Sequence, residues 1–386
     1  MELPDPTRAA GLARLRAFTP RMGAAYAAGR NADPGPGLRQ DVARLSAHLR
    51  HRLLLEEEVV GAALAAHGPQ AAAKFVQEVF WRTYWKGFLQ LRPALWEDCK
   101  AGLAQDQARL LTNGGLRRAV EQATQGRTGI APFDAWAAEL REQGWLHNHA
   151  RMWFASIWIF TLRLPWRLGA EHFRLHLADA DAASNTLSWR WVAGIQTPGK
   201  HYLARAENIA RYTGGRFDPR GQLDEGAEPL DEPGPPPPAP LPALPPLPDG
   251  EVALLLHEDD LHVESLPPWR VRRIAAVAAR DDAAPLPRAW TAAALEDALA
   301  RAEARWGAPA RRIAAKEVTT WADGLPVVTP DIPAGWLDDA LAGVAAHRWR
   351  RPWDAACWPL ARKGFFPFRE AIPELLATLD PRPPAC

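Results

Sequence analysis

A long proline-rich run is the feature that most restricts how this chain can fold. Between Gly226 and Gly250 the sequence reads GAEPLDEPGPPPPAPLPALPPLPDG. Proline fixes φ and has no backbone donor, so consecutive prolines exclude helix and sheet and form a stiff, extended spacer. The chain is therefore predicted to divide into three parts: residues 1–222, a linker over residues 223–249, and residues 250–386.

The part before the linker carries helical periodicity. Apolar residues recur at helical spacing over residues 39–50 and 71–91, and residues 148–164 are apolar nearly all round, as in a central buried helix. Gly144 and Pro165 are predicted helix ends or breaks. Because strand-like runs are nearly absent here, we predict a mainly α domain.

The part after the linker has a different pattern. Residues 251–256 (EVALLL) form a short apolar run of strand length, and residues 272–279 and 311–318 are further candidate strands. Helices are predicted over residues 291–306 and 336–347. Strands that alternate with helices favour a small α/β domain with a parallel sheet.

Charge and cysteine content exclude several classes of protein. The chain has 46 Lys and Arg against 45 Asp and Glu, a net charge of +1, so any nucleic-acid contact needs a local basic patch. Cys99, Cys357 and Cys386 form no CxxC pair, which favours a reducing cytoplasm without a disulfide framework or zinc site. No signal-peptide pattern opens the sequence, and the apolar run at 152–160 is far shorter than the roughly 20 residues that span a bilayer. We therefore expect a soluble cytoplasmic protein with no membrane partner.

The residues best suited to bind a cofactor or take part in catalysis lie between positions 128 and 217. Arg151 interrupts an otherwise apolar helix, and a buried guanidinium needs an acidic partner. Asp179, Asp181 and Asn185 follow, with several indoles nearby. Such a set can surround a large planar polar cofactor. Taken singly, however, such Trp residues are more often core residues than redox carriers, and an Asp-x-Asp pair is more often a helix cap with a surface charge than a ligand pair.

Two histidine pairs have spacings that raise the question of a metal. His147 and His149 are two residues apart, so on a helix they point in different directions, and we interpret them as a cap and a polar contact. The segment from His257 to His262 (HEDDLH) is interpreted as a solvated loop, with a metal site as the less favoured alternative. We predict no metal site.

The segment from Thr128 to Trp191 resembles the FAD-binding domain of the DNA photolyase/cryptochrome family. It contains that family's TG…D, GW-x-HN-x-x-RM, W-x-x-G and D-x-D-x-x-x-N-x-x-x-W-x-W blocks in order. The matching residues are Thr128, Gly129, Asp134, Gly144, Trp145, His147, Asn148, Arg151, Met152, Trp166, Gly169, Asp179, Asp181, Asn185, Trp189 and Trp191. Upstream, Glu78, Trp81 and Arg82 resemble the family's E-x-x-W-R block, and Tyr26 and Ser46 resemble its flavin-phosphate segment.

The resemblance implies FAD as the cofactor. It implies an ion pair between Arg151 and Asp179 beside the flavin ring, contact of Asp181 with the flavin or adenine, and Asn185 facing flavin N5. The implied cofactor-binding residues are Tyr26, Ser46, Arg82, Arg151, Asp179, Asp181 and Asn185.

The resemblance also implies electron transfer through tryptophans. Trp189 and Trp166 are the implied proximal and middle carriers. The family's distal Trp has no counterpart, and Trp153 and Trp158 are candidates that the sequence does not place.

The residues implied on the substrate side match enzymes that split cyclobutane pyrimidine dimers. The implied catalytic residues are Glu78, Trp81, Asn148, Met152 and Trp191. The implied DNA contacts are His149, where the family usually has Arg, and Lys200, which can equally be a surface charge.

The family's antenna-binding α/β domain normally precedes the flavin domain, and only about 20 residues do so here. The stretch VALLLHEDDLHVES at 252–265 is similar to the opening of that antenna domain. Two interpretations stay open for residues 250–386: a permuted, reduced antenna domain, with or without a second chromophore, and an unrelated α/β domain.

The overall prediction is a photolyase-like FAD-binding helical domain followed by a small α/β domain. The predicted function is light-driven repair of cyclobutane pyrimidine dimers in DNA, double- or single-stranded, by an electron from reduced flavin. The alternative is a cryptochrome-like photoreceptor or redox flavoprotein that signals to a partner through the C-terminal domain. A relative that has lost flavin is disfavoured because Arg151, Asp179, Asp181 and Asn185 are all retained.

Overall fold

The computed structural model describes residues 4–384, which form two compact units. The first unit contains residues 25–42 and 92–237, and the second contains residues 4–24, 43–91 and 238–384. Within the described range, no helix is both long enough and apolar enough to cross a membrane.

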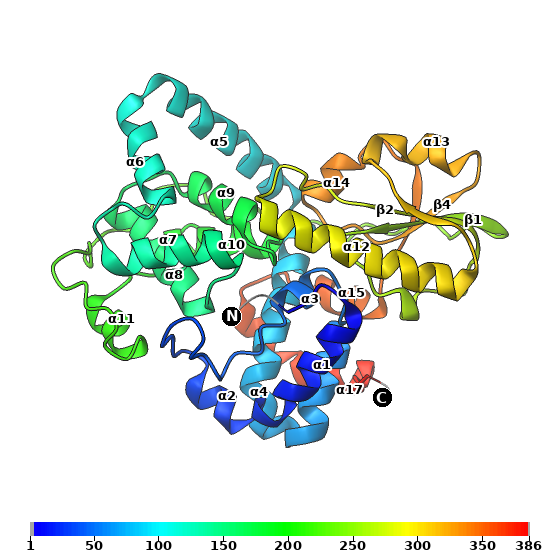
Figure 1. Ribbon diagram of the computed structural model, residues 1–386, viewed down its shortest axis with the longest axis horizontal. Coiled ribbons are helices and arrows are strands. Elements are labelled where there is room, and N and C mark those ends of the chain that lie inside the picture. The colour runs from blue at the N-terminus through cyan, green and yellow to red at the C-terminus, as the bar shows by residue number, and fades with distance from the viewer. Residues whose placement is uncertain (1–3, 385–386) are drawn as a thin grey trace. The chain divides into compact units, whose positions relative to one another are not determined.

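The first unit is helical, as predicted (Figure 1). Its helices are α5 (Pro93–Thr112), α6 (Gly114–Thr124), α7 (Ala131–Gln143), α8 (Asn148–Ser156), α9 (Trp166–His176), α10 (Ala182–Ala193) and α11 (Ala206–Tyr212), with most of α2 (Ala24–Gly29). The predicted central helix is α8 continued by a π-helical turn, Ile157–Thr161, and Trp153 and Trp158 in it are fully buried. The predicted helix end at Gly144 is confirmed, since this residue closes α7 at φ 61°.

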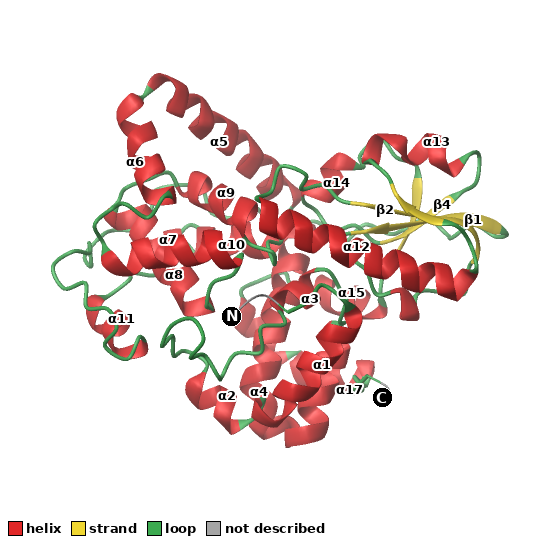
Figure 2. Ribbon diagram, viewed as in Figure 1, coloured by secondary structure: helices red, strands yellow, loops and turns green. Residues whose placement is uncertain are grey.

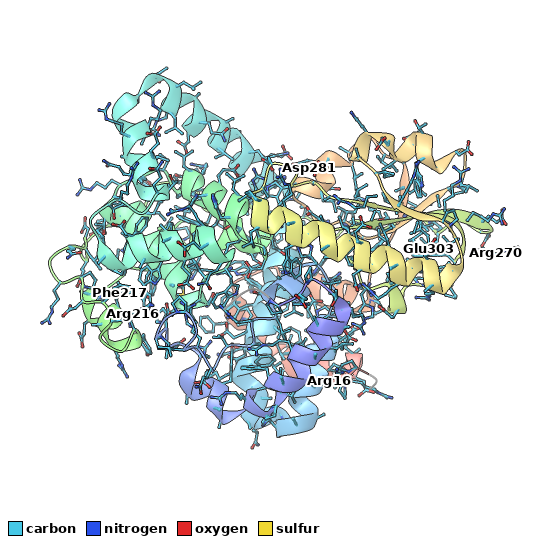
Figure 3. The ribbon with its side chains drawn as sticks, in the orientation of Figure 1. Arg16, Arg216, Phe217, Arg270, Asp281 and Glu303 are labelled. Carbon is cyan, nitrogen blue, oxygen red and sulfur yellow. The ribbon has the colours of Figure 1, made fainter. Side chains whose placement is uncertain are left out.

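The segment 25–42 is held to the rest of the first unit by buried charges. Arg39 donates to Asp33 at 2.6 Å and pairs through both guanidinium nitrogens with Glu139 on α7. Arg216 reaches Asp33 at 3.5 Å and lies 4.5 Å from the centre of the Phe217 ring (Figure 3). These pairs replace the polar contacts that burial removes.

The helix predicted over residues 39–50 is wrong for most of its length. Only Ser46–Arg50 (α3) is helical. Arg44, just before it, has φ +56°, a left-handed conformation that no helix of L-residues accommodates. Apolar spacing alone does not reveal that backbone reversal.

The second unit combines helices with a parallel sheet. Its helices are α1 (Arg8–Phe18), α3, α4 (Glu56–Gln90), α12 (Pro285–Trp306), α13 (Val318–Ala322), α14 (Trp336–Ala340), α15 (Pro352–Cys357), α16 (Phe365–Glu370) and α17 (Ile372–Leu379). The long helix α4 contains the predicted helix 71–91 except for Leu91, its C-cap, and bends where Gly68 (φ 73°) precedes Pro69.

The predicted parallel sheet is confirmed. Its strands are β1 (Glu251–His257), β2 (Arg270–Val277), β3 (Ala310–Arg312), β4 (Val327–Pro330) and β5 (Ala346–Trp349), in the order β3-β2-β1-β4-β5. Figure 2 shows α12 along one face and α13 with α14 toward the other. Ala253 and Leu255 of β1 join the core under α13 and α14, so Leu254 and Leu256 face α12 by strand alternation. A sheet clad on both faces explains the unbroken apolar run of β1.

Two element predictions in this unit need correction. The helix predicted over residues 336–347 ends at Ala340, and Ala346–Trp349 is strand β5 instead, paired with β4. The strand predicted over 311–318 is only Ala310–Arg312. Hydrogen bonding to neighbouring strands decides both outcomes. Local hydrophobic periodicity contains no information on those long-range pairings.

The segment from His257 to His262 is not the solvated loop that its acidic composition predicts. His257, Glu258, Asp260 and His262 are buried. Arg351 donates twice to Asp260, at 2.6 and 2.7 Å, and its charge lowers the pKa of that carboxyl against the opposing effect of burial. The loop is buried because arginines of the same unit neutralise it.

The first part of the proline-rich segment has neither helix nor strand, as predicted, and packs on the first unit. Leu230 donates its backbone N–H to Ala193 at 3.0 Å. Arg190 and Arg92 donate to the carbonyls of Pro233 and Pro236, at 3.0 and 2.9 Å. Proline lacks a backbone donor but keeps its carbonyl acceptor, and these carbonyls bind the arginine side chains. This stretch is therefore held by hydrogen bonds against the first unit, beside α10.

Candidate functional site

The predicted ion pair between Arg151 and Asp179 is present in the first unit. Arg151 on α8 donates to both carboxylate oxygens of Asp179 at 3.0 and 2.8 Å, and its Nε donates to the Leu146 carbonyl at 3.0 Å. The Asp179 side chain is 3% exposed, whereas that of Arg151 is 24% exposed. The bidentate pair fixes the guanidinium plane and leaves part of it accessible to a ligand.

The N-terminus of α10 adds two polar groups. Asp181 is the N-cap and accepts from the Ser184 N–H at 2.7 Å, which confirms the cap expected for one residue of the Asp-x-Asp pair. Asn185, half-buried one turn on, donates its Nδ2 to the Ala170 carbonyl at 2.8 Å. Its Oδ1 and the second hydrogen of Nδ2 are therefore the groups that it can present to a ligand.

This donor set suits a flavin. The polar edge of an isoalloxazine ring offers carbonyl oxygens to a guanidinium and N–H groups to carboxylate or amide oxygens. Arg151, Asp179, Asp181 and Asn185 supply both kinds of partner from α8 and α10.

The Thr-Gly…Asp block has a structural role here. Asp134, in the first turn of α7, accepts from the backbone N–H groups of Thr128 and Gly129, each at 2.9 Å, and from the Thr128 hydroxyl at 2.7 Å. These bonds close the turn that starts α7.

The two predicted electron carriers are both buried in the first unit. Trp189 on α10 packs edge-on against Trp158, with ring centres 6.3 Å apart and planes at 86°. Trp166, the first residue of α9, donates its indole N–H to Glu232 at 3.1 Å. The structure thus places Trp158 beside Trp189. The only sequence signal for it is an indole within the apolar central helix.

Three predicted substrate-side residues also lie in the first unit. Asn148 is exposed at the start of α8, Met152 is half-buried one turn later, and Trp191 is half-buried against Tyr202, with ring centres 5.8 Å apart. Their roles stay predictions.

The two predicted DNA contacts differ in their surroundings. His149 stacks on Trp153 with ring centres 4.0 Å apart, and its Nδ1 lies 3.1 Å from the Asn31 carbonyl. Burial lowers its pKa, so the ring is neutral near pH 7 and attracts phosphate less than the Arg usual in the family. Lys200 is exposed. The His147 cap predicted for α8 is confirmed, because its Nδ1 accepts the His149 N–H at 3.2 Å.

Four predicted site residues lie in the second unit. Glu78 and Trp81 are three residues apart on α4 and so share a helix face, and both are partly buried. Trp81 lies flat on Phe365 of α16, with ring centres 3.6 Å apart and planes at 13°. One face of its indole is therefore covered by the chain itself.

Arg82 and Ser46 complete this second group. Arg82 is 3.4 Å from Glu56 and donates to the Arg50 carbonyl at 3.2 Å. Ser46 starts α3 and is half-buried. Tyr26, the remaining predicted flavin contact, lies half-buried on α2 in the first unit.

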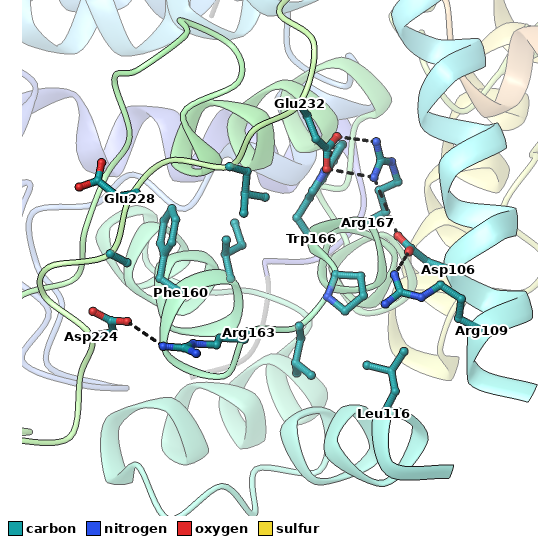
Figure 4. Close-up of a pocket in the computed structure, with 15 residues that line it drawn as sticks. Asp106, Arg109, Leu116, Phe160, Arg163, Trp166, Arg167, Asp224, Glu228 and Glu232 are labelled. Atoms are coloured by element: carbon teal, nitrogen blue, oxygen red, sulfur yellow. Dashed lines mark hydrogen bonds and ion pairs between the residues drawn. The ribbon is translucent and has the colours of Figure 1, made fainter. Parts of the chain in front are cut away.

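A pocket of about 580 Å³ opens beside Trp166 in the first unit (Figure 4). Its polar wall includes Glu228 and the ion pairs Arg109–Asp106 at 3.0 Å and Arg167–Glu232 at 2.7 Å, with Arg163 3.7 Å from Asp224. Its apolar wall is formed by Leu116, Ile159, Phe160, Leu164, Pro165, Trp166 and Leu230. Sequence analysis misses this pocket because Glu232 and Asp224 come from the predicted linker.

Across residues 4–384, no group of three or more His, Cys, Asp or Glu side chains is placed to hold a metal ion.

Comparison with known proteins confirms the resemblance drawn from the motifs. Residues 75–223 match the family described as the FAD binding domain of DNA photolyase. This segment of the chain is therefore similar to a photolyase-type flavin domain, and the match supports FAD as its cofactor.

The chain is similar to two kinds of named relative. It is 35% identical over 184 residues to a deoxyribodipyrimidine photo-lyase of Streptomyces griseus, covering 47% of this chain and 38% of that protein. It is 39% identical over 98 residues to Cryptochrome-1 of Arabidopsis thaliana, covering 25% of this chain and 14% of that protein. The chain spans well under half the length of these relatives. A solved class III photolyase of Agrobacterium tumefaciens is 26% identical, with a TM-score of 0.46 over 54% of this chain and 43% of that one.

Proposed function

We propose that this protein uses reduced FAD and blue light to split cyclobutane pyrimidine dimers in DNA. The observation that carries the proposal is the Arg151–Asp179 ion pair, with Asp181 and Asn185 on the adjoining helix, inside a segment that matches a photolyase flavin domain. When bound, FAD supplies the light absorption and the electron. The residues of this chain hold and orient it, and they bind the lesion.

Several residues are assigned roles on the substrate side. The carboxyl of Glu78, in its protonated form, is proposed to donate a hydrogen bond to a pyrimidine carbonyl oxygen and so stabilise developing negative charge. We propose that Trp191 stacks on a base that has left the duplex and that Asn148 and Met152 contact the same base. Trp81 has only the ring face opposite Phe365 to offer. Lys200 is to meet a phosphate.

The test is repair of an oligonucleotide with one thymine dimer by purified, dithionite-reduced protein under blue light. The absorption spectrum of the same sample reports flavin content. We expect light-dependent loss of dimers, and we expect Glu78→Gln to lower the repair yield at least tenfold with flavin content unchanged. Glu303→Gln is the control, because Glu303 is an exposed carboxylate on α12 (Figure 3). Equal repair by the Glu78 variant and the parent would disprove the role of Glu78.

The second candidate is a photoreceptor or redox flavoprotein that does not repair DNA and that signals through the C-terminal part. Two observations favour it: Phe365 covers one face of Trp81, and a half-buried His149 stands where the family usually has Arg. Flavin-loaded protein that leaves dimers intact in the assay above would select this function. For either function we place the protein in the cytoplasm, as its cysteine usage suggests.

A further inference from the structure

The indole of Trp189 has another tryptophan as its ring neighbour. Trp158 meets it edge-on at 6.3 Å, and Phe173 packs on it at 5.2 Å. The backbone of α9 passes against both indoles: a Cβ on Gly169 would lie 2.3 Å from Cη2 of Trp189 and 3.0 Å from Cε2 of Trp158. Glycine at position 169 therefore permits the close packing of this pair.

Trp158 is also connected to Trp166. Its indole N–H donates to the Pro165 carbonyl at 2.9 Å, and Pro165 is bonded to Trp166. A continuous path thus runs from Trp189 to Trp158 across a ring contact, and from Trp158 to Trp166 through one hydrogen bond and one peptide unit.

The three indole N–H groups differ in what they can do with a proton. That of Trp189 is buried without an acceptor among the described residues. That of Trp158 faces a carbonyl oxygen, which does not take up a proton. That of Trp166 faces both oxygens of Glu232, at 3.1 and 3.4 Å, and a carboxylate does take one up. Oxidation is therefore most easily stabilised at Trp166.

The surroundings of Trp166 link loss of its electron to loss of its proton. The guanidinium of Arg167 lies 4.6 Å from the ring centre, and so it opposes a lasting positive charge on the indole. The same guanidinium holds the Glu232 carboxylate in place at 2.7 Å. Transfer of the indole proton to Glu232 removes the unfavourable charge. Trp166 and Glu232 both line the pocket, so a small reductant can approach them there (Figure 4).

We propose that Trp158 carries electrons between Trp166 and Trp189, and that Trp166 ends the route with Glu232 as the acceptor of its indole proton. This inference rests on the proposed flavin photochemistry. With FAD bound and excited, an electron that Trp189 gives up would be replaced by one from Trp158, and that one by an electron from Trp166. The Trp166 Nε1 proton passes to Glu232. A small thiol in the pocket then gives up one electron to Trp166 and its own proton to solvent, while Glu232 returns the indole proton.

The first experiment compares Trp158→Phe with Trp153→Phe. Trp153 lies on α8, is equally buried, and stacks instead on Trp136 and His149. Photoreduction of bound FAD by blue light in dithiothreitol is measured together with the transient absorption of tryptophan radicals. We expect Trp158→Phe to lower the photoreduction rate at least tenfold and to abolish the long-lived radical signal, and Trp153→Phe to change neither. Wild-type photoreduction in the Trp158 variant would overturn the inference.

Repair by dithionite-reduced protein separates this inference from the proposed function. The Trp158 variant should repair dimers as the parent does, because that reaction starts from flavin already reduced. If the parent repairs nothing while Trp158→Phe still blocks photoreduction, the proposed repair function fails and the electron route stands. If repair proceeds and Trp158→Phe photoreduces normally, the electron route fails alone.

The proton acceptor is tested without flavin. Pulse radiolysis with azidyl radicals oxidises tryptophans of the flavin-free protein, and the protonated and neutral indole radicals have different spectra. We expect Glu232→Gln to prolong the protonated radical about tenfold relative to the parent. Glu228→Gln, a change to another carboxylate on the same pocket wall, is the control and should leave that lifetime unchanged. Equal lifetimes in the Glu232 variant and the parent would exclude Glu232 as the acceptor.

Discussion

The indole of Trp81 lies face to face with the phenyl ring of Phe365, with ring centres 3.6 Å apart and planes 13° from parallel. These residues are 284 positions apart, and they join α4 to α16 within the second unit. Phe365 also contacts Tyr84 and Phe368, so it belongs to a larger aromatic cluster. Phe365 thus covers one face of the indole that the proposed lesion site would offer to the dimer.

Removing the Phe365 ring tests whether Trp81 contributes to recognition of the dimer. Phe365→Ala should cost about 3 kcal/mol of unfolding free energy, since the ring is buried, and it should uncover the Trp81 face. We expect binding to dimer-containing oligonucleotide to tighten relative to undamaged oligonucleotide, measured by fluorescence anisotropy. Phe368→Ala, in the same cluster but without the face-on stack on Trp81, is the control. Unchanged discrimination in both variants would assign Trp81 to the core.

The Arg151–Asp179 pair should control flavin retention. Asp179→Asn keeps the side-chain shape and removes the charge that pairs with Arg151. Losing one partner of a charged hydrogen-bonded pair costs about 1–3 kcal/mol, so flavin affinity should fall about tenfold or more. Equilibrium dialysis measures this. Asp218→Asn breaks the pair with Arg220, whose side chain is largely exposed, and should leave affinity unchanged. Undiminished flavin retention by Asp179→Asn would count against the role of the pair.

His147 should make stability fall as pH falls. Burial lowers its pKa to about 4, against the opposing charge of Asp33. Its Nε2–H donates to the Arg30 carbonyl and its Nδ1 accepts the His149 N–H, so both nitrogens are engaged in the neutral form.

The sign follows from where the protons bind. In the unfolded chain His147 is protonated below about pH 6.5, whereas in the folded chain it stays neutral down to about pH 4. The free energy of unfolding therefore falls between these pH values, by roughly 3 kcal/mol at most. Urea unfolding at a series of pH values measures the slope. His147→Asn keeps a capping side chain and should flatten it. A slope equal to that of the parent would refute this account.

The buried pair of Arg52 and Asp354 should be among the most costly to break in the second unit. Arg52 donates to both Asp354 oxygens at 2.7 and 2.6 Å. Although burial opposes its charge, the carboxylates of Asp354, Glu56 and Asp260 raise its pKa well above the usual value. Asp354→Asn should cost about 3–5 kcal/mol in denaturant unfolding. Asp323→Asn, which breaks an exposed pair with Arg273, should cost less than about 1 kcal/mol. Equal costs would contradict the assignment.

Gly169 should tolerate no side chain. The added methyl group of Gly169→Ala would press on Trp189 and Trp158, and we expect a loss of about 1–3 kcal/mol in unfolding free energy. Gly115 on α6 has more room, because a methyl group there would have its nearest neighbour at 3.4 Å. Gly115→Ala should therefore raise stability by up to about 1 kcal/mol through helix propensity. Thermal unfolding followed by circular dichroism compares the two.

Much of the helical part could be predicted from the sequence, because the signals are short-range. Gly144 closes α7 and Asp181 caps α10 through contacts within four residues. That Arg151 needs an acidic partner was predictable too, since a buried guanidinium on an apolar helix requires one, and the family resemblance implied that the partner is Asp179. The apolar strand β1 and its parallel neighbours follow from the same local patterns.

Only the tertiary structure decided the remaining features. The composition of the acidic loop after β1 predicts a solvated segment, but in the folded chain Arg351, 91 residues away from Asp260, neutralises that carboxylate and the loop is buried. Phe365 covers Trp81, and Trp158 meets Trp189, because helices distant in sequence pack together. Composition and spacing record which groups a chain can bury. Which groups meet depends on long-range packing, where the same residue types have many acceptable partners and only the folded chain selects one.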